Sequence, residues 1–537
     1  MKSKTNRSWK ISVFALLLAV LAVISIGCAS ADTIYVPEGW NQTIQQAVNN
    51  ASSGDIIIVR DGTYDENVDV DKRLTIKSEN GSANCIVNAS DPSDNIFEVT
   101  ADYVNVTGFT VKGATSYKKA GIYLDDVEHC DISNNNVSNN NRGIYLSHSH
   151  YNNLTGNNAP KNKNGIYSLW SRYNTLTNNT LTNNTYGIYL CASSSNNLMD
   201  NTFVNDGLFL SSGYYNTVVN NTVNGKPLVY LEDTSDYMVP DAGQVILVKC
   251  NNVTVENRDL SNTAVGVELW ETTNSTITNN TVSNNTYGIY LRSSSNNTLT
   301  NNTASNNNRG IYLYHSSNNN LTGNSANSNN DYGIYLDSSS NNSLNNNTMS
   351  GNTYNFGVYS YSLSGYTQNI DTSNSVDGKP VYYWINLRDK QIPDDAGYVG
   401  VVNSTNITVK DLTLSHNSKG VLFVYTNNSK IENVNTSNNY YDIYLYSSSN
   451  NTLTNNTASN NNRGIYLSHS SNNNTLTNNT ANSNNDGIYL DSSSNNTIYN
   501  NYFNNTNNAL DNGNNKWSIL IYPSLHANQN LKRTPFP

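Results

Sequence analysis

The sequence has little charge, few cysteines and, after its first thirty residues, no long apolar run. Charged residues make up 13% of the chain, and the formal net charge is −10 without a basic cluster inside the repeats, so nucleic acid is not an expected partner. The cysteines Cys85, Cys130, Cys191 and Cys250 are scattered at spacings that do not form a disulfide framework, and we expect them to be free.

The one long apolar stretch lies at the N-terminus. A basic start, "MKSKTNRSWK", is followed by "ISVFALLLAVLAVISIG" and by small residues up to Ala31, which predicts a signal peptide over residues 1–31. Lipid attachment at Cys28 and an uncleaved anchor are the alternatives. We expect an exported protein, extracellular or on the cell surface, with no membrane insertion after cleavage because no later run approaches about twenty apolar residues.

A four-residue motif, G-[IV]-x-[LS], recurs at a fixed distance. It begins at Gly121, Gly143, Gly165, Gly187, Gly266, Gly288, Gly310, Gly333, Gly464 and Gly487, and in the same register at Asp442. Most steps are 22 residues, for example from Gly121 to Gly143. A repeat of this length that continues over hundreds of residues is typical of a solenoid.

Each repeat contains short alternating runs separated by Ser and Asn. In one repeat Ile289 and Leu291 flank Tyr290, and Leu299 lies between two threonines. Alternation with period two indicates short strands with one buried face, and Asn tolerates the left-handed conformation of tight corners. The sequence predicts an all-β fold, a right-handed single-stranded parallel β-helix of the pectin-lyase type with about 22 residues per coil, in which identical Asn side chains form ladders. A leucine-rich repeat is the alternative fold.

Two zones interrupt the regular repeats. "NGKPLVYLEDTSDYMVPDAG" near residues 224–265 is echoed by "DGKPVYYWINLRDKQIPDDAG" near residues 377–419. Before the repeats, "TIQQAVNNA" has a Thr43–Gln46 capping box, which predicts a short N-terminal capping helix. We therefore expect an N-terminal cap and first coils over residues 32–120, repeats over residues 121–517 and an atypical C-terminal tail over residues 518–537.

These features carry a family resemblance. The G-I-x-L coils, the "GKP…DAG" echo and the opening "TIYVPEGWNQTIQQAVNNASSGDIIIVRDGTYDENV" resemble exported parallel β-helix repeat (PbH1) proteins of the NosD type. These are also described as carbohydrate-binding and sugar-hydrolysis domains and are found on methanogenic archaea. The resemblance implies the fold and a surface location, and it implies handling of copper as one alternative function. The histidines His148, His150, His315, His416 and His469 are scattered, so we expect neither a metal site nor a cofactor.

The third residue of most motifs, between the Ile and the Leu, is tyrosine, and the chain contains 38 tyrosines in all. Because Ile and Leu point inward, we expect these tyrosines to point outward as an exposed aromatic stripe that binds sugar rings. The stripe comprises Tyr123, Tyr145, Tyr167, Tyr189, Tyr290, Tyr312, Tyr335, Tyr444, Tyr466 and Tyr489. The alternative is that each ring only covers its neighbours above and below.

An enzymatic role would need several acidic side chains close together. The candidates are Lys379, Asp394 and Asp395 in the second echo zone, and the alternative is that they belong to ordinary turns. About thirty N-x-[ST] sequons, such as those of Asn296 and Asn450, predict a glycoprotein. We expect a non-catalytic surface β-helix protein that binds envelope polysaccharide or other surface proteins; a polysaccharide lyase or hydrolase and a NosD-like copper-handling protein are the alternatives.

Overall fold

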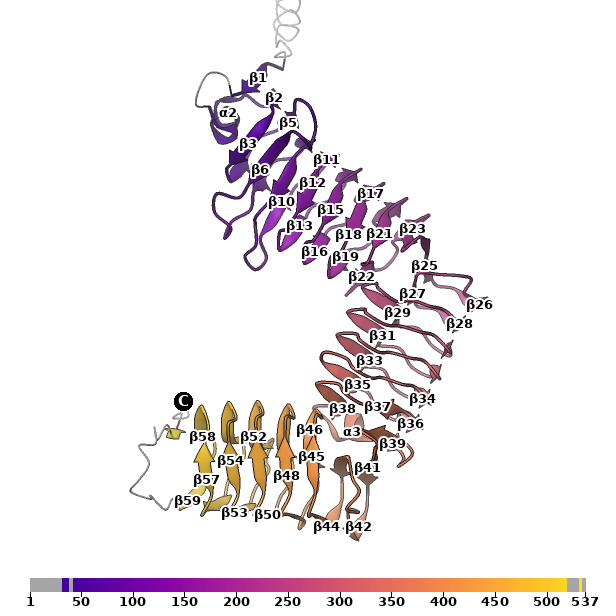
Figure 1. Ribbon diagram of the computed structural model, residues 1–537, viewed down its shortest axis with the longest axis vertical. Coiled ribbons are helices and arrows are strands. Elements are labelled where there is room, and N and C mark those ends of the chain that lie inside the picture. Colours follow the sequence, from indigo (N-terminus) through magenta and orange to yellow (C-terminus); the bar gives the residue numbers. More distant parts are fainter. Residues whose placement is uncertain (1–30, 38–41, 519–530, 534–537) are drawn as a thin grey trace, which may run out of the picture.

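In the computed structural model, which describes residues 31–37, 42–518 and 531–533, the chain winds into a solenoid of short parallel strands (Figure 1). Ile122 pairs with Ile144, and Ile144 pairs with Ile166, so one coil is 22 residues long. The fold is therefore the expected parallel β-helix. The predicted signal peptide and most of the predicted tail lie outside the described residues.

The motif strands form one side of each part of the solenoid and belong to three different sheets. They are β4 (Val68–Val70), β7 (Phe97–Val99), β10 (Ala120–Asp125), β13 (Arg142–Ser147), β16 (Asn164–Leu169), β19 (Tyr186–Cys191), β22 (Leu208–Leu210), β25 (Lys226–Glu232), β27 (Gln244–Val248), β29 (Val265–Trp270), β31 (Tyr287–Arg292), β33 (Arg309–Tyr314), β35 (Tyr332–Asp337), β38 (Tyr354–Tyr359), β41 (Lys379–Ile385), β43 (Tyr398–Val402), β46 (Lys419–Val424), β49 (Tyr441–Tyr446), β52 (Arg463–Ser468), β55 (Asp486–Asp491) and β58 (Asn507–Asp511).

The other two sides consist of shorter strands. In the N-terminal part they are β1 (Thr33–Val36), β2 (Ile56–Val59), β5 (Thr75–Ser78), β8 (Asn105–Thr107), β11 (Asp131–Ser133), β14 (Asn153–Thr155), β17 (Thr175–Thr177), β20 (Asn197–Met199) and β23 (Thr217–Val219) on one side, and β3 (Gly62–Asp65), β6 (Cys85–Asn88), β9 (Thr110–Lys112), β12 (Asn136–Ser138), β15 (Asn158–Pro160), β18 (Thr180–Thr182), β21 (Thr202–Val204) and β24 (Thr222–Val223) on the other.

The later parts repeat this arrangement. Their shorter strands are β26 (Ser235–Met238), β28 (Asn251–Glu256), β30 (Thr276–Thr278), β32 (Thr298–Thr300), β34 (Asn320–Thr322), β36 (Ser343–Asn345), β37 (Thr348–Met349), β39 (Asn369–Ile370) and β40 (Ser375–Val376), then β42 (Arg388–Gln391), β44 (Thr405–Lys410), β45 (Thr413–Ser415), β47 (Lys430–Glu432), β48 (Asn435–Ser437), β50 (Thr452–Thr454), β51 (Thr457–Ser459), β53 (Thr475–Thr477), β54 (Thr480–Asn482), β56 (Thr497–Tyr499), β57 (Tyr502–Asn504) and β59 (Lys516–Ser518). Strand β60 (Leu531–Arg533) pairs with β58.

The glycine of most motifs is required by the close approach of neighbouring coils, and Asp442 is the exception. A Cβ atom on Gly310 would lie 2.5 Å from the carbonyl oxygen of Gly333, and one on Gly143 would lie 2.4 Å from that of Gly165. Real Cβ atoms do not come this close to backbone oxygens, so any side chain at these positions would push two coils apart.

Ladders of buried asparagine hold the corners together, as expected. The Nδ2 of Asn297 donates to Oδ1 of Asn319 in the next coil at 3.2 Å, and the backbone N–H of Asn297 donates to the same oxygen at 2.9 Å. Asn297 also bonds the backbone of the preceding coil, so buried backbone groups at the corner find partners. The asparagine runs in the sequence are thus a structural requirement of the corners.

The helix α2 (Ile44–Asn50) caps the N-terminal end. Thr43 and Gln46 form the expected capping box, and Ile44, Ala47 and Val48 are buried against the first coils. A second short helix, α3 (Leu363–Tyr366), lies beside β38. Within the described ranges, no helix is both long enough and apolar enough to cross a membrane.

Two antiparallel hairpins divide the solenoid into three segments. Strand β24 turns through Asn224 and Gly225 into β25, and β40 turns through Asp377 and Gly378 into β41. All four turn residues have positive φ, which is typical of the tight hairpin turns that Asn-Gly and Asp-Gly form. We call the parts β1–β24, β25–β40 and β41–β59 the N-terminal, middle and C-terminal segments. The rod bends at each hairpin, and the motif strands lie on its concave side (Figure 1).

Candidate functional site

The outer surface of the motif strands, which we call the concave face, carries the predicted tyrosines in a column. Tyr123 and Tyr145 have ring centroids 4.7 Å apart, Tyr290 and Tyr312 5.3 Å, and Tyr466 and Tyr489 5.1 Å. The planes of the last two pairs differ by only 10° and 7°. Parallel strands one coil apart place identical side chains at this spacing, so the rings stack along the rod axis.

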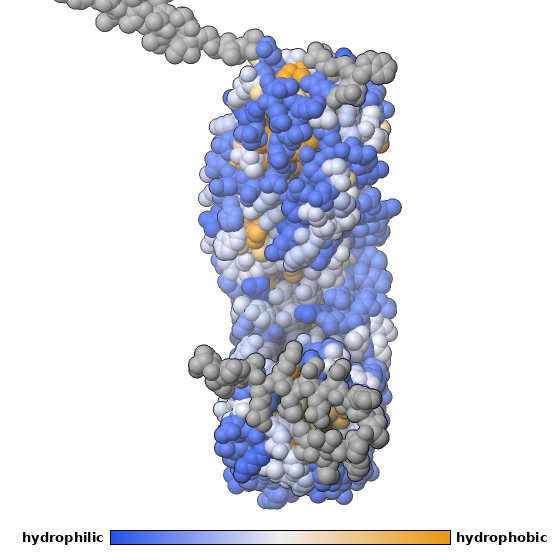
Figure 2. Space-filling model, turned by 90° about the vertical axis from the view of Figure 1, so that its left-hand side faces the viewer, coloured by the Kyte–Doolittle hydropathy of each residue, from blue (hydrophilic) through white to orange (hydrophobic). Residues whose placement is uncertain are grey.

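The tyrosines of the predicted stripe are less exposed than we expected. Tyr167, Tyr290, Tyr312, Tyr444 and Tyr466 are buried, and the other five are only half-buried. The physical reason is that the faces of most rings lie against neighbouring rings, so the face area that a sugar ring would need is used within the column. The five half-buried rings keep part of their surface toward the solvent. Figure 2, which looks onto the concave side, shows mainly hydrophilic and intermediate colours there.

Arginines lie between successive rings of the column. The guanidinium carbon of Arg142 is 4.1 Å from the Tyr145 centroid and 4.0 Å from that of Tyr167. Arg463 lies 4.3 Å from both Tyr466 and Tyr489. Such cation–π contacts stabilise the column and leave the N–H groups of the guanidinium for further hydrogen bonds.

Carboxylates flank the column on its other edge. The hydroxyl of Tyr312 donates to Asp337 at 3.3 Å, and the hydroxyl of Tyr466 donates to Asp491 at the same distance. Burial raises the pKa of the Tyr466 hydroxyl to about 12, so it stays protonated. The concave face therefore carries a row of tyrosine hydroxyls with single guanidinium and carboxylate groups beside it, which are suited to hydrogen bonding with a polyhydroxylated ligand.

The column continues across the first hairpin. Phe209, on the last motif strand of the N-terminal segment, lies 5.1 Å from Tyr189 and 6.1 Å from Tyr290, which is 81 residues further on in the chain. Beside it Glu268 is fully buried, and its carboxylate accepts the N–H of Leu210 at 3.3 Å. Burial raises the pKa of Glu268 to about 8.

The second hairpin also has a buried charge. The Lys419 side chain is buried, with its ammonium 2.8 Å from the Ser418 hydroxyl and 5.1 Å from the ring of Tyr359. Burial lowers the pKa of Lys419 to about 7. The sequence reasoning missed both joints, although the Asn-Gly and Asp-Gly dipeptides that begin the echo zones are a strong hairpin signal.

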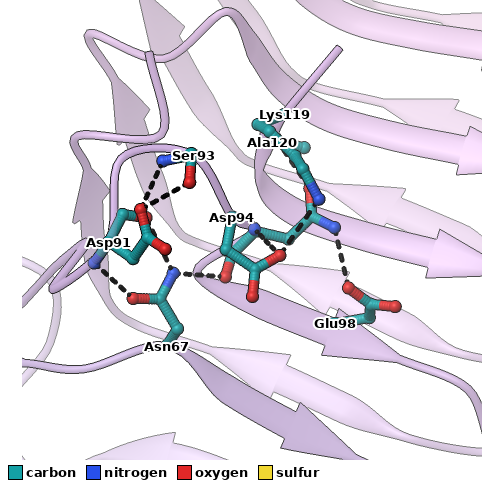
Figure 3. A network of polar contacts seen from close by, with 8 residues as sticks. Asn67, Asp91, Ser93, Asp94, Glu98, Lys119 and Ala120 are labelled. Carbon is teal, nitrogen blue, oxygen red and sulfur yellow. Dashed lines mark hydrogen bonds and ion pairs between the residues drawn. The ribbon is translucent and has the colours of Figure 1, made fainter. Parts of the chain in front are cut away.

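Polar contacts close the N-terminal end of the concave face (Figure 3). Asn95 accepts the N–H of Ala120 at 2.9 Å and donates to Glu98 at 2.8 Å. Lys119 forms an ion pair with Asp94 at 3.0 Å. Glu98 pairs with Tyr123 in the sheet, so it stands one coil before the tyrosine column.

The candidate catalytic residues lie on the second hairpin region. The carboxylate of Asp395 accepts the hydroxyl of Tyr382 at 2.9 Å, while Lys379 and Asp394 are exposed. The equivalent residues of the first hairpin, Lys226 and Asp241, form an ion pair at 3.4 Å. Their catalytic role stays a prediction.

The histidines do not fit a copper centre. His150 accepts the backbone N–H of Arg172 through Nδ1, and the Nδ1 of His148 lies 3.1 Å from the Ser147 hydroxyl. Across the residues with a described placement, no three His, Cys, Asp or Glu side chains are grouped so that they could hold a metal ion. No step of the proposed function therefore involves copper.

Parts of the chain are similar to known proteins. A "Cell surface glycoprotein" of Methanothermus fervidus is 38% identical over 132 residues, which span 24% of this chain and 21% of that protein. Among solved structures, the catalytic domain of a GH87 alpha-1,3-glucanase has a TM-score of 0.30 at 14% identity over 65% of this chain and 70% of its own. The DFA-IIIase of Arthrobacter chlorophenolicus has a TM-score of 0.30 at 12% identity, with 71% of this chain and 95% of its own covered.

A family model covers almost the entire described chain. The model described as "Periplasmic copper-binding protein (NosD)" matches residues 48–244, 231–382 and 368–528. The chain therefore belongs to the NosD family.

Proposed function

We propose that the protein is a non-catalytic rod of the cell surface that holds a polysaccharide chain along its concave face. The observation that carries the proposal is the tyrosine column, which crosses the first hairpin through Phe209 and Tyr290 and has a counterpart in the C-terminal segment. At the second hairpin the Lys419 ammonium lies between the two columns, 5.9 Å from the ring of Tyr335 and 5.8 Å from that of Tyr441. A linear polymer needs equivalent groups repeated along a line, and the solenoid repeats its tyrosine hydroxyls at about 4.8 Å.

The binding groups in this proposal are the hydroxyls, because the ring faces are already stacked. Tyr335 is half-buried, and its ring centroid lies 5.7 Å from that of Tyr312. Hydrogen bonds to the charged neighbours Arg309 and Asp337 would add to those of the hydroxyls. The exported and surface location rests on the leader-like N-terminus and on the surface glycoprotein that the chain resembles.

N-linked glycans would coat the outside of the rod. In the repeated N-N-T sequons the first Asn, such as Asn296 or Asn301, is exposed at a corner, while the second, such as Asn297, is a buried ladder residue. The acceptor of each such sequon therefore faces solvent. Mass spectrometry of protein from its native source should find glycans on Asn296 or Asn301, and glycan-free peptides throughout would contradict this part of the proposal.

The binding test is a pull-down of residues 32–537 on insoluble envelope and plant polysaccharides, with released sugar measured in the same tubes. The double variant Tyr312→Phe with Tyr335→Phe keeps both rings and removes two hydroxyls, so binding should weaken by about tenfold, the value of one to two hydrogen bonds. Tyr502→Phe on the C-terminal segment is the control. Unchanged binding in the double variant would refute the role of the concave face, and released sugar would favour the enzyme alternative with Lys379, Asp394 and Asp395.

A further inference from the structure

A second aromatic column runs along a corner of the N-terminal segment, just after the concave strands. Tyr103, His129, Tyr151 and Tyr173 stand there one coil apart. The ring centroids are 5.0 Å apart for Tyr103 and His129 and 5.6 Å for His129 and Tyr151. Tyr151 and Tyr173 are 5.0 Å apart with 9° between their planes, so the four rings form one stack parallel to the rod axis.

The backbone of this column is unusual for such large residues. All four have φ between 56° and 60°, in the left-handed region. In the middle segment the same corner position is held by asparagines such as Asn296, whose N–H donates to the next coil as that of Tyr151 does. Asparagine adopts this conformation readily, whereas a bulky side chain there costs free energy. Such outliers persist mainly where a side chain has a function.

The stack is interrupted by one small residue. The corner of the next coil holds Ser195 with φ 59°, and the coil after that holds Tyr215 with φ 63°. Because coils rise by about 4.8 Å, the rings of Tyr173 and Tyr215 are about 10 Å apart along the axis. Stacked rings need about 5 Å each, so the space over Ser195, which we call the Ser195 gap, has the length of one inserted ring.

The two rings that bound the Ser195 gap are both exposed and held in place. Tyr173 is 52% exposed and is backed by Tyr151 on its other face. Tyr215 is 65% exposed, its N–H donates to the Glu232 carboxylate at 2.7 Å, and the Lys249 ammonium lies 4.9 Å from its centroid. The gap thus has two aromatic walls and a polar surrounding.

We propose that the Ser195 gap binds one pyranose ring of a β-1,4-linked glucose chain, inserted between Tyr173 and Tyr215. In such a sugar the hydroxyls are equatorial, so both faces of the ring are apolar C–H surfaces and the rim is polar. Two aromatic walls match the two faces, and the open sides leave the rim to solvent and to the exposed Arg172. Trp170, 53% exposed in the same corner, offers a further platform for the neighbouring sugar. This site uses stacking and lies off the concave face, so it goes beyond the proposed function and can fail or succeed separately from it.

The decisive variant fills the gap. Ser195→Tyr would complete the aromatic stack at a corner whose neighbours already carry tyrosine in the same conformation. Isothermal titration of the chain from residue 32 with cellohexaose should show binding that Ser195→Tyr weakens at least tenfold without lowering the unfolding temperature. If the exposed tyrosines only attracted sugar nonspecifically, an added tyrosine would instead leave binding equal or stronger, which would overturn the proposal.

A second variant tests the walls. Tyr215→Asn installs the residue that other segments use at this corner, so the backbone stays favourable while one wall is lost. Binding of cellohexaose should fall at least tenfold. Tyr502→Thr is the matched control, since Tyr502 is 49% exposed and the paired residue in the preceding coil is Thr480. Unchanged binding in Tyr215→Asn, or no binding of cellohexaose by the parent protein, would overturn the proposal, whatever the concave-face variants do.

Discussion

Removal of a single ladder amide, Asn297→Ala, should destabilise the middle segment by several kcal/mol. Asn297 is 1% exposed, and its Oδ1 accepts the N–H of Ser275 at 2.9 Å while its Nδ2 donates to the carbonyl of Thr272 at 2.9 Å. The alanine variant leaves both backbone groups buried without these partners. Each such group costs about 1–3 kcal/mol, so the loss should be about 2–6 kcal/mol.

The matched control is Asn296→Gly, one residue earlier. Asn296 is exposed with φ 61°, a conformation that glycine adopts freely, so its replacement should change stability by less than about 0.5 kcal/mol. The two variants therefore separate the ladder from the corner.

A solenoid can open locally, so the assay should be local as well. Native-state hydrogen exchange of the Ser275 amide and its neighbours reports the free energy of opening of these coils. A loss of about 2 kcal/mol or more predicts exchange at least about thirtyfold faster in Asn297→Ala than in the parent. Equal exchange in Asn297→Ala and Asn296→Gly would refute the view that buried amide ladders stabilise the corners.

Three further substitutions test the close approach of the coils and the buried charges at the joints. Gly310→Ala should lower the unfolding temperature in a thermal scan, because its Cβ would lie 2.5 Å from the Gly333 carbonyl oxygen and overpacking costs about 1–3 kcal/mol; an unchanged temperature would mean that the coils separate easily. Burial raises the pKa of Glu268 from 4.5 to about 8, so its ionisation destabilises the folded state increasingly as pH rises between these values. Glu268→Gln should therefore be about 4 kcal/mol more stable than the parent in urea at pH 8 and equal to it at pH 4. Burial lowers the pKa of Lys419 from 10.5 to about 7, so the pH dependence of stability has the opposite sign there. Lys419→Met should gain stability over the parent as pH falls from about 10.5 to 7. Parallel pH profiles of variant and parent would contradict the burial of a charged group at that joint.

The regular part of the fold could be predicted because each coil repeats the same local requirements. The 22-residue spacing of the motifs, the Thr43–Gln46 capping box and the buried asparagines follow directly from sequence patterns. The joints could not be predicted from the repeat, since Glu268 and Lys419 are buried by segments that meet only after the rod has bent. The Asn224-Gly225 dipeptide was a local signal for the first of them.

The exposure of the tyrosines was overestimated for a related reason. Alternation of residues tells which side of a strand a ring is on, but stacking between coils decides how much of it stays exposed, and Tyr290 and Tyr312 cover each other. The aromatic corner beside the Ser195 gap is indicated weakly in the sequence. The corners that read "SSSNN" elsewhere read "HSHYNN" around Tyr151 and "WSRYN" around Tyr173, which mark the strained aromatic positions.

The asparagine ladders also have a direction. Between successive buried ladder asparagines the Nδ2 group donates toward the C-terminal coil, as from Asn135 to Asn157 and from Asn157 to Asn179, so these amide dipoles are aligned along the rod. One ladder ends at Asp206, whose carboxyl group accepts a hydrogen bond from Asn184 and has no amide group to donate to a following coil. Along the ladder itself, each finished coil offers an amide donor to the ladder residue of the coil that follows it, which favours folding in the order in which the chain is synthesised. An acidic residue at a ladder position is the natural terminator of that process.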